Sequence, residues 1–196
     1  MRTRGSNCVI TYIDLAGTKV DAETGEASKR MQRLHQVVAE AVSGHALASI
    51  SHAYTWNDSV IAVSRVRDAA GSFIEILRDL EVLKTRIDSV SRNYVVCVKG
   101  LAFPRFKTSR ARRVTILETS SWAMANCFVI EAALKKHRAN WYIDGRIIRR
   151  IQGLRPTGRE RVRMHPKSKT RWIYFFKSDL DLQRKHDEKN ARSTDF

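Results

Sequence analysis

The sequence has few cysteines, few prolines and no long apolar run. Its 196 residues include three prolines and three cysteines, at Cys8, Cys97 and Cys127. Three thiols in apolar segments do not make a disulfide framework, so we expect buried free thiols and a reducing, cytoplasmic location. No segment approaches the roughly 20 apolar residues of a membrane span. The first six residues lack the apolar stretch of a secretory signal.

Acidic residues are scarce relative to basic ones. The chain carries 36 Lys and Arg against 20 Asp and Glu, a formal net charge of +16. Such an excess predicts an anionic partner, which can be a nucleic acid, a lipid surface or a polyphosphate substrate. The basic residues are densest in 105–113 and 146–185. A solvated basic face that aids solubility is the alternative.

The apolar periodicity predicts an α+β fold. Helices are expected at 22–42, 69–89 and 120–137, and strands at 9–13, 47–56, 60–66, 94–102, 114–117, 140–148 and 171–176. The segment 104–113 is expected to be a basic loop. This order predicts a ferredoxin-like βαββαβ core with additional strand and helix elements. That fold serves RNA-binding modules and nucleotide enzymes alike.

The amino-acid composition changes after Arg149, where Gly and Pro occur among many Arg and Lys residues. We expect a main domain at 1–150 and a basic C-terminal extension at 151–196, with one late strand and about ten disordered residues at its end. The aromatic residues of the late strand, Trp172, Tyr174 and Phe175, can stack on bases, but their alternation favours the strand core.

Two aspartates follow apolar strands in the first part of the chain. Asp14 ends the run that begins at Cys8, and no helix starts close enough behind it to need an N-cap. Asp58 lies in a tight Asn57-Asp58 turn between two expected strands. Each taken alone is also explained by ordinary turn chemistry. In a βαββ unit, however, the end of the first strand and the tip of the hairpin can approach each other.

Two neighbouring carboxylates at such a position suit divalent cations. Asp14 and Asp58 could bridge two Mg²⁺ or Mn²⁺ ions roughly 3.5–4 Å apart. One ion would lower the pKa of a ribose hydroxyl, and the other would hold a triphosphate. The backbone N–H groups of Ala16, Gly17 and Thr18 would cradle the phosphates ahead of the following helix.

The two segments resemble motifs of the class III nucleotidyl cyclases. Asp14-Leu15-Ala16-Gly17-Thr18 is similar to the family's Asp-x-x-Gly-Phe-Thr segment, and 54–58, Tyr-Thr-Trp-Asn-Asp, is similar to its Lys-Thr-x-Gly-Asp hairpin. The likeness covers roughly residues 8–148. It implies that both aspartates bind two metal ions and that Leu15 donates its backbone carbonyl to a metal. It also implies that 1–150 is a cyclase catalytic domain.

The sequence departs from the family at the base-reading and phosphate positions. Tyr54 stands where purine cyclases carry Lys or Glu, and a tyrosine there narrows the pocket toward a smaller pyrimidine. Glu118 falls near the second base-reading position. The family's Asn and Arg on the later helix align with Ala125 and Val129, so both are missing. The loop 105–113 is then the nearest expected source of a cation.

With these departures, the sequence resembles the small pyrimidine cyclases of bacterial Pycsar anti-phage systems. The resemblance implies cyclic UMP or cyclic CMP as product, with UTP preferred over CTP, and a separate effector that senses it. It further implies a homodimer with composite sites, in which the aspartates of one chain face the base-reading residues of the other. The rivals are a basic nucleic-acid-binding module, which has no use for Asp14, and an inactive cyclase-derived scaffold.

Overall fold

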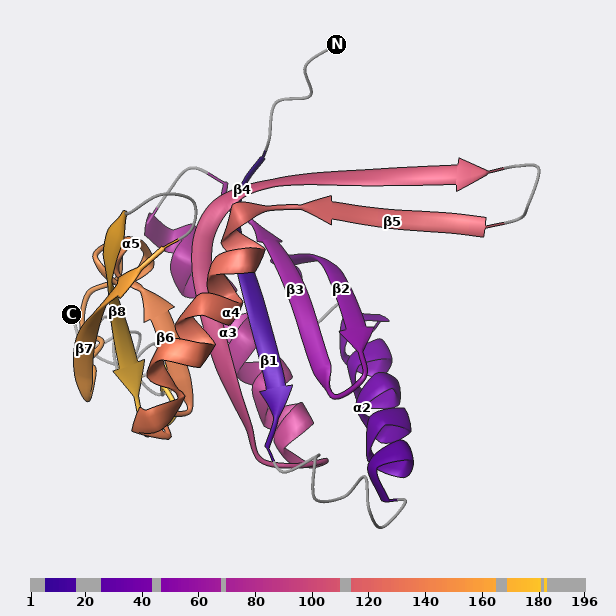
Figure 1. The fold of residues 1–196 in the computed structure, drawn as a ribbon, viewed down its shortest axis with the longest axis horizontal. Coiled ribbons are helices and arrows are strands. Elements are labelled where there is room, and N and C mark those ends of the chain that lie inside the picture. Colours follow the sequence, from indigo (N-terminus) through magenta and orange to yellow (C-terminus); the bar gives the residue numbers. More distant parts are fainter. Residues whose placement is uncertain are drawn as a thin grey trace, which may run out of the picture.

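The computed structural model describes residues 6–16, 26–43, 47–67, 70–109, 114–164, 169–180 and 182, and within 102–109 and 114–120 it describes the backbone. The elements follow the predicted order (Figure 1). They are β1 (Ser6–Leu15), α2 (Glu26–Ser43), β2 (Ile50–Trp56), β3 (Ser59–Arg65), α3 (Ala70–Asp88), β4 (Asn93–Ser109), β5 (Val114–Ser120), α4 (Trp122–Leu134), a 3₁₀ turn (Lys135–His137), β6 (Trp141–Asp144), α5 (Gly145–Ile148), β7 (Gly158–Arg163) and β8 (Thr170–Phe176).

One sheet organises these elements. Its strand order is β2-β3-β1-β4-β6-β8-β7, and β5 pairs with the outer part of β4. All neighbouring strands are antiparallel except β4 and β6, which are parallel. The first four strands, with α2 and α3, make the βαββαβ unit that the sequence predicts. The ferredoxin-like α+β core with additional elements is therefore confirmed.

The first strand is apolar throughout because both faces of the sheet are covered. Val9 and Ile13 join the core beneath α2 and α3, whereas Cys8 and Ile10 join a second core beneath α4. Figure 1 shows α4 on the opposite side of the sheet from α2 and α3. A strand buried on both faces reads as a continuous apolar run instead of an alternating one. β1 therefore lies in the centre of the sheet, and Asp14 lies near its C-terminal end, at one end of the sheet.

The thiols lie where the sequence predicts them. Cys8, Cys97 and Cys127 are buried and unbridged. Burial raises the pKa of Cys97 to about 12, so this thiol stays protonated. None of the helices in the described ranges combines the length and hydropathy needed to cross a bilayer.

The structure overturns two predicted boundaries. The expected loop at 104–113 is wrong over 104–109, because β4 continues to Ser109 and pairs with β5 in a hairpin that extends away from the sheet (Figure 1). Residues 110–113 lie outside the described part. The expected strand 140–148 is β6 followed by the single helical turn α5, which Asp144 caps by accepting a hydrogen bond from the Arg146 amide.

Two late strands extend the sheet beyond β6. The predicted strand 171–176 is confirmed as β8, and β7 was missed because its sequence alternates Arg and Glu with a single buried valine, Val162. Phe175 is buried as expected, but Trp172 is 39% exposed, so the expectation of a core position is wrong for it. The division of the chain at residue 150 stays a prediction, and the expected C-terminal disorder falls on undescribed residues.

Close contact between α4 and β4 gives a stability prediction. A Cβ added at Gly100 would lie 2.4 Å from the Cβ of Ala123, whereas one added at Gly71 in α3 meets nothing within 4 Å. We expect Gly100→Ala to lower the free energy of unfolding by about 1–3 kcal/mol through overpacking. Gly71→Ala is the matched control and should raise it by about 0.5–1 kcal/mol. Chemical denaturation measures both, and an unchanged Gly100→Ala midpoint would contradict the contact.

Candidate active site

The two predicted aspartates meet at one end of the sheet. Asp14 lies near the end of β1, opposite Ser59 at the start of β3, and Asp58 lies in the turn between β2 and β3. The amide of Leu15 donates a hydrogen bond of 3.1 Å to the carbonyl oxygen of Asp58. This bond ties the hairpin tip to the strand end. Asp14 and Asp58 consequently line the same pocket.

The turn that carries Asp58 has a left-handed residue. Asn57 has a φ of 51°, a conformation that asparagine adopts more readily than most residues. The chain therefore reverses within two residues between Trp56 and Ser59, as the sequence predicts. A tight turn of this kind holds Asp58 at a fixed position above the end of the sheet.

Three hydroxyl groups orient the Asp14 carboxylate. Tyr12 and Ser59 donate to its Oδ1 at 3.0 and 2.8 Å, and Tyr94 donates to its Oδ2 at 2.6 Å. The pKa of Asp14 is nevertheless raised, first because the carboxyl is buried and further because Asp58 adds a nearby negative charge. The hydroxyl donors oppose this rise. Two carboxylates thus repel each other in a partly buried site, and a cation would relieve that repulsion.

Tyr94 also contacts a third carboxylate. Its hydroxyl lies 2.6 Å from Oε1 of Glu131 on α4 as well as 2.6 Å from Asp14. A phenol carries one hydrogen and can donate to only one of them at a time. Burial also raises the pKa of Tyr94, so the phenol keeps its proton. The Tyr94 hydroxyl therefore joins Asp14 on β1 to Glu131 on α4 through one shared hydrogen.

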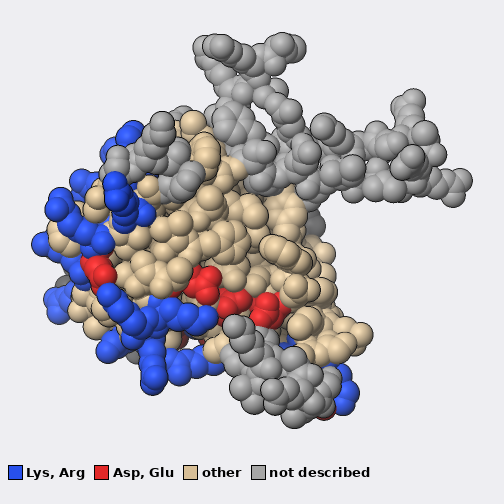
Figure 2. Space-filling view, in the orientation of Figure 1, with Lys and Arg blue, Asp and Glu red and all other residues tan. Residues whose placement is uncertain are grey.

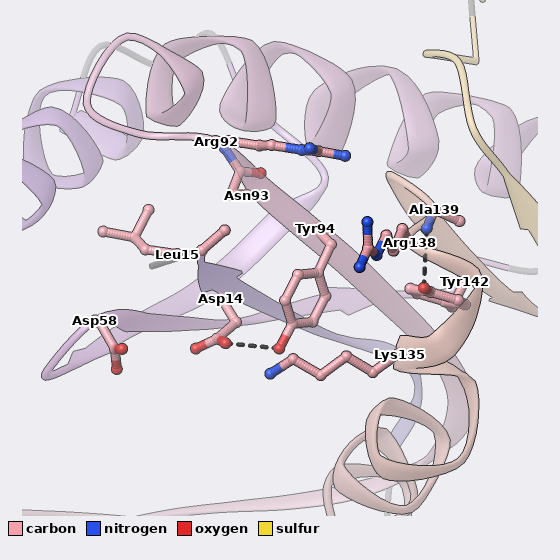
Figure 3. A pocket seen from close by; sticks show the side chains of 11 residues that line it. Asp14, Leu15, Asp58, Arg92, Asn93, Tyr94, Lys135, Arg138, Ala139 and Tyr142 are labelled. Carbon is pink, nitrogen blue, oxygen red and sulfur yellow. Dashed lines mark hydrogen bonds between the residues drawn. The ribbon is translucent and has the colours of Figure 1, made fainter. Parts of the chain in front are cut away.

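Basic side chains lie across the pocket from the aspartates. The pocket has a volume of about 400 Å³, and its described lining includes Arg92, Lys135 and Arg138. Figure 3 shows the Lys135 side chain extending toward Asp14, and Arg138 on the other side of Tyr94 from the two aspartates. Lys135 Nζ lies 3.3 Å from Glu131 Oε1 and 5.5 Å from the centre of the Tyr94 ring. The pocket therefore has an acidic side and a basic side.

The acidic side fits a divalent cation held jointly with a substrate. Within the described ranges, no group of three or more His, Cys, Asp or Glu side chains is arranged to hold a metal by itself. Mg²⁺ is, however, commonly bound by one or two carboxylates together with substrate phosphates. Asp14 and Asp58 supply two carboxylates in one pocket, and the pKa of Asp14 is raised by burial and, to a smaller extent, by the charge of Asp58. These residues fit such an ion.

The other predicted site residues fall in different places. Leu15 and Ala16 line the pocket with the aspartates. Gly17 and Thr18 lie outside the described residues. Tyr54 is half-buried on β2, where its ring stacks on His52 at 6.5 Å between centroids, and it is not among the described lining residues. The backbone of Glu118 pairs with that of Arg105 in the β4–β5 hairpin. The roles of all these residues stay predictions.

The basic side of the pocket was not predicted. We expected the cation in 105–113, but the backbone of 105–109 lies in the projecting hairpin (Figure 1). Lys135 lies instead in the 3₁₀ turn after α4, Arg138 is the residue that follows this turn, and Arg92 directly precedes β4. The one available signal was the basic cluster 135–138 immediately after an apolar helix.

Comparison with solved structures shows what this architecture resembles. The adenylyl cyclase CyaB from P. aeruginosa gives a TM-score of 0.64 at 11% identity, over 92% of this chain and all of that one (100%). The guanylate cyclase domain of RhGC from Catenaria anguillulae in complex with GTP gives 0.60 at 12% identity, over 88% and 97%. The guanylyl cyclase Cya2 gives 0.59 at 9% identity, over 88% and 93%.

Sequence comparisons add nothing to this likeness, since no protein-family model and no curated protein matches the chain. At identities of 9–12% the similarity concerns the fold. The α+β sheet of this chain, with its helices on both faces, has the fold of the class III adenylyl and guanylyl cyclases.

Proposed function

We propose that the chain is a nucleotide cyclase that converts UTP, or less efficiently CTP, into the 3′,5′-cyclic monophosphate and pyrophosphate. One observation carries the proposal: on a cyclase fold, a single pocket holds two carboxylates on one side and three cationic side chains on the other. Carboxylates bind the divalent cations that accompany a nucleoside triphosphate, and Lys and Arg bind its phosphates.

The pocket residues divide the work of the reaction. The ribose 3′-hydroxyl attacks the α-phosphorus, the bond from that phosphorus to the bridging oxygen of the β-phosphate breaks, and pyrophosphate leaves. Asp14 and Asp58 would hold the divalent ions, which when bound lower the pKa of the hydroxyl and offset charge on the phosphates. Tyr12, Ser59 and Tyr94 fix the orientation of the Asp14 carboxylate.

The cations across the pocket would hold the triphosphate. Lys135, Arg138 and Arg92 offer positive charge where the helix residues Ala125 and Val129 offer none. A fixed cation near a transferring phosphoryl group stabilises charge that develops on the phosphate oxygens. We therefore assign to Lys135 and Arg138 the stabilising role that was first expected of residues 105–113.

Pyrimidine selectivity rests on Tyr54. Its sequence position is the one at which purine cyclases of the resembled family carry Lys or Glu. Tyr54 is not among the described residues that line the pocket of its own chain. A homodimer with composite sites, in which Tyr54 and Glu118 of one protomer reach the pocket of its partner, would bring base and metal residues together. The cyclic product would then serve as an anti-phage signal to a separate effector.

The decisive experiment supplies all four ribonucleoside triphosphates. Purified protein is incubated with each in turn, with Mn²⁺ or Mg²⁺ and with EDTA, and products are read by mass spectrometry. We expect cyclic UMP as the main product, less cyclic CMP, and no product in EDTA. A cyclic purine product would overturn the pyrimidine assignment, and no cyclic product from any substrate would favour the inactive scaffold.

A Tyr54 series tests the source of selectivity. Tyr54→Ala is expected to lower the ratio of kcat/KM for UTP over ATP by about 10-fold or more, because the pocket loses both its narrowing ring and its hydroxyl. Tyr54→Phe keeps the ring stacked on His52 and isolates the hydroxyl. Equal loss of turnover with every nucleotide in Tyr54→Ala would indicate a structural role instead.

A further inference from the structure

Arginines and a tryptophan share one face of the last two strands. Arg159, Arg161 and Arg163 alternate along β7, and all three are exposed while Val162 between them is buried. In the β7–β8 register, Arg161 lies opposite Trp172. Residues two apart in a strand project from the same face, about 6.6 Å apart. We call Arg159, Arg161, Arg163 and Trp172 the arginine–tryptophan surface.

The indole of this surface is packed by guanidinium groups yet remains accessible. The guanidinium carbons of Arg159 and Arg161 lie 4.5 and 5.3 Å from the centre of the Trp172 ring. The tryptophan is still 39% exposed. An indole flanked by guanidinium planes offers the flat, cationic platform on which nucleic-acid bases stack.

The one acidic residue of β7 and β8, Glu160, pairs with residues outside this surface. Glu160, which alternates with the arginines on β7, contacts Lys136 at 2.9 Å and His137 at 2.6 Å. Among the described residues, no carboxylate forms an ion pair with Arg159, Arg161 or Arg163. The positive charge of the surface is therefore available to an external anion.

A buried carboxylate anchors β8, the strand that carries Trp172. Asp144 is fully buried, with an exposed fraction of 0%, and accepts hydrogen bonds from Arg171 at 3.1 Å and Arg146 at 2.8 Å. Gly145 packs closely against Trp172, since a Cβ added there would lie 2.9 Å from the Trp172 carbonyl oxygen. Arg171 is thereby engaged with Asp144, and the backbone beneath the indole is fixed.

The surface lies within a larger basic region. Figure 2 shows Lys and Arg gathered over the end of the molecule where β7 and β8 lie. The nearby segment adds Arg149, Arg150 and Arg155, all exposed. A field of this kind attracts polyanions and raises their rate of association.

Protection of a sheet edge explains only part of this arrangement. β7 is the last strand of the sheet order, and charged side chains on an edge strand discourage pairing with other sheets. An exposed tryptophan has the opposite effect, because a large apolar ring at a free edge promotes association. Its position beside Arg159 and Arg161 suits a ligand that has both negative charge and flat aromatic groups.

We propose that the arginine–tryptophan surface binds single-stranded nucleic acid, with phosphates on the arginines and a base stacked on Trp172. The spacing of alternate β7 side chains is comparable to that of successive phosphates in an extended strand, and a single strand exposes bases that a duplex keeps stacked. This site is separate from the pocket at Asp14, and the proposal does not depend on the proposed cyclase activity.

Fluorescence anisotropy with labelled oligouridylate and oligothymidylate tests the proposal on the full chain. Trp172→Ala is expected to weaken binding about 10-fold, within the range for loss of one base–aromatic stack. Arg159→Ala with Arg161→Ala should reduce the slope of log affinity against log salt by about 1.4, since each single-strand phosphate contact contributes about 0.7. Thermal unfolding monitors the fold, and Trp172→Phe keeps a ring for partial binding.

Matched controls separate this site from general basicity. Arg33→Ala with Arg86→Ala removes the same charge from exposed positions on α2 and α3 and should retain most of the binding. Equal weakening by both double variants would overturn the proposal, as would unchanged binding in Trp172→Ala. A blunt duplex bound as tightly as the single strand would also overturn it. So would binding to phosphatidylserine vesicles without binding to either oligonucleotide.

Discussion

Asp14→Asn and Asp58→Asn are each expected to lower the rate of cyclic nucleotide formation by about 10³-fold, the size of effect found when a group that stabilises transition-state charge is lost. The two carboxylates line one pocket and their charges repel each other, which is the arrangement that a bound divalent cation would stabilise. Asparagine keeps the size of each side chain and removes the charge. Mass spectrometry of the product from UTP with Mn²⁺ measures the loss.

Stability measurements distinguish loss of chemistry from loss of fold. The pKa of Asp14 is raised by burial, so the ionised carboxylate is disfavoured in the folded chain and a neutral side chain should not destabilise it. We expect the melting temperature of Asp14→Asn to be unchanged or higher. Glu40→Gln on the exposed face of α2 is the control and should leave turnover intact. Full activity in Asp14→Asn would contradict the assignment of this residue.

The meeting of Asp14 with Asp58 could be predicted because it follows from local rules. The apolar run that ends at Asp14 marks a strand buried on both faces, and Asn57-Asp58 marks a tight turn. In a βαββ unit, the antiparallel pairing of β1 with β3 brings the end of β1 next to the turn between β2 and β3. The hydrogen bond from the Leu15 amide to the Asp58 carbonyl oxygen joins the two. Few other strand arrangements are compatible with both the buried strand and the tight turn.

The basic side of the pocket could not be predicted because it depends on long-range geometry. Lys135 and Arg138 reach the pocket because α4 packs across the sheet and ends in a 3₁₀ turn before β6 joins β4. The strand 114–117 was predicted and is part of β5, but its partner 104–109 was predicted to be a loop because its basic residues and Pro104 hide the continuation of β4. Strand β7 was missed for the same reason, because its arginines read as a solvated tail.

Lys135→Met and Arg138→Asn are each expected to lower kcat/KM for the nucleoside triphosphate by about 10²-fold, and together by more. Methionine keeps most of the aliphatic length of Lys135 and loses its charge. Arg138 has a φ of 49° and a ψ of 39°, the left-handed conformation, which asparagine tolerates well. Arg138→Asn therefore removes the guanidinium without adding backbone strain, and its free energy of unfolding should be nearly unchanged.

Lys136→Met provides the matched control for Lys135. The two lysines are adjacent, but Lys136 pairs with Glu160 on β7 and is not among the described residues of the pocket. Its replacement should cost little activity, because a partly exposed ion pair contributes about 0–1 kcal/mol to stability and nothing to substrate binding. Equal losses in Lys135→Met and Lys136→Met would mean that the basic turn acts through its general charge. A loss confined to Lys135→Met and Arg138→Asn requires the triphosphate to lie between these cations and the two aspartates, which is the geometry on which the cyclase reaction depends.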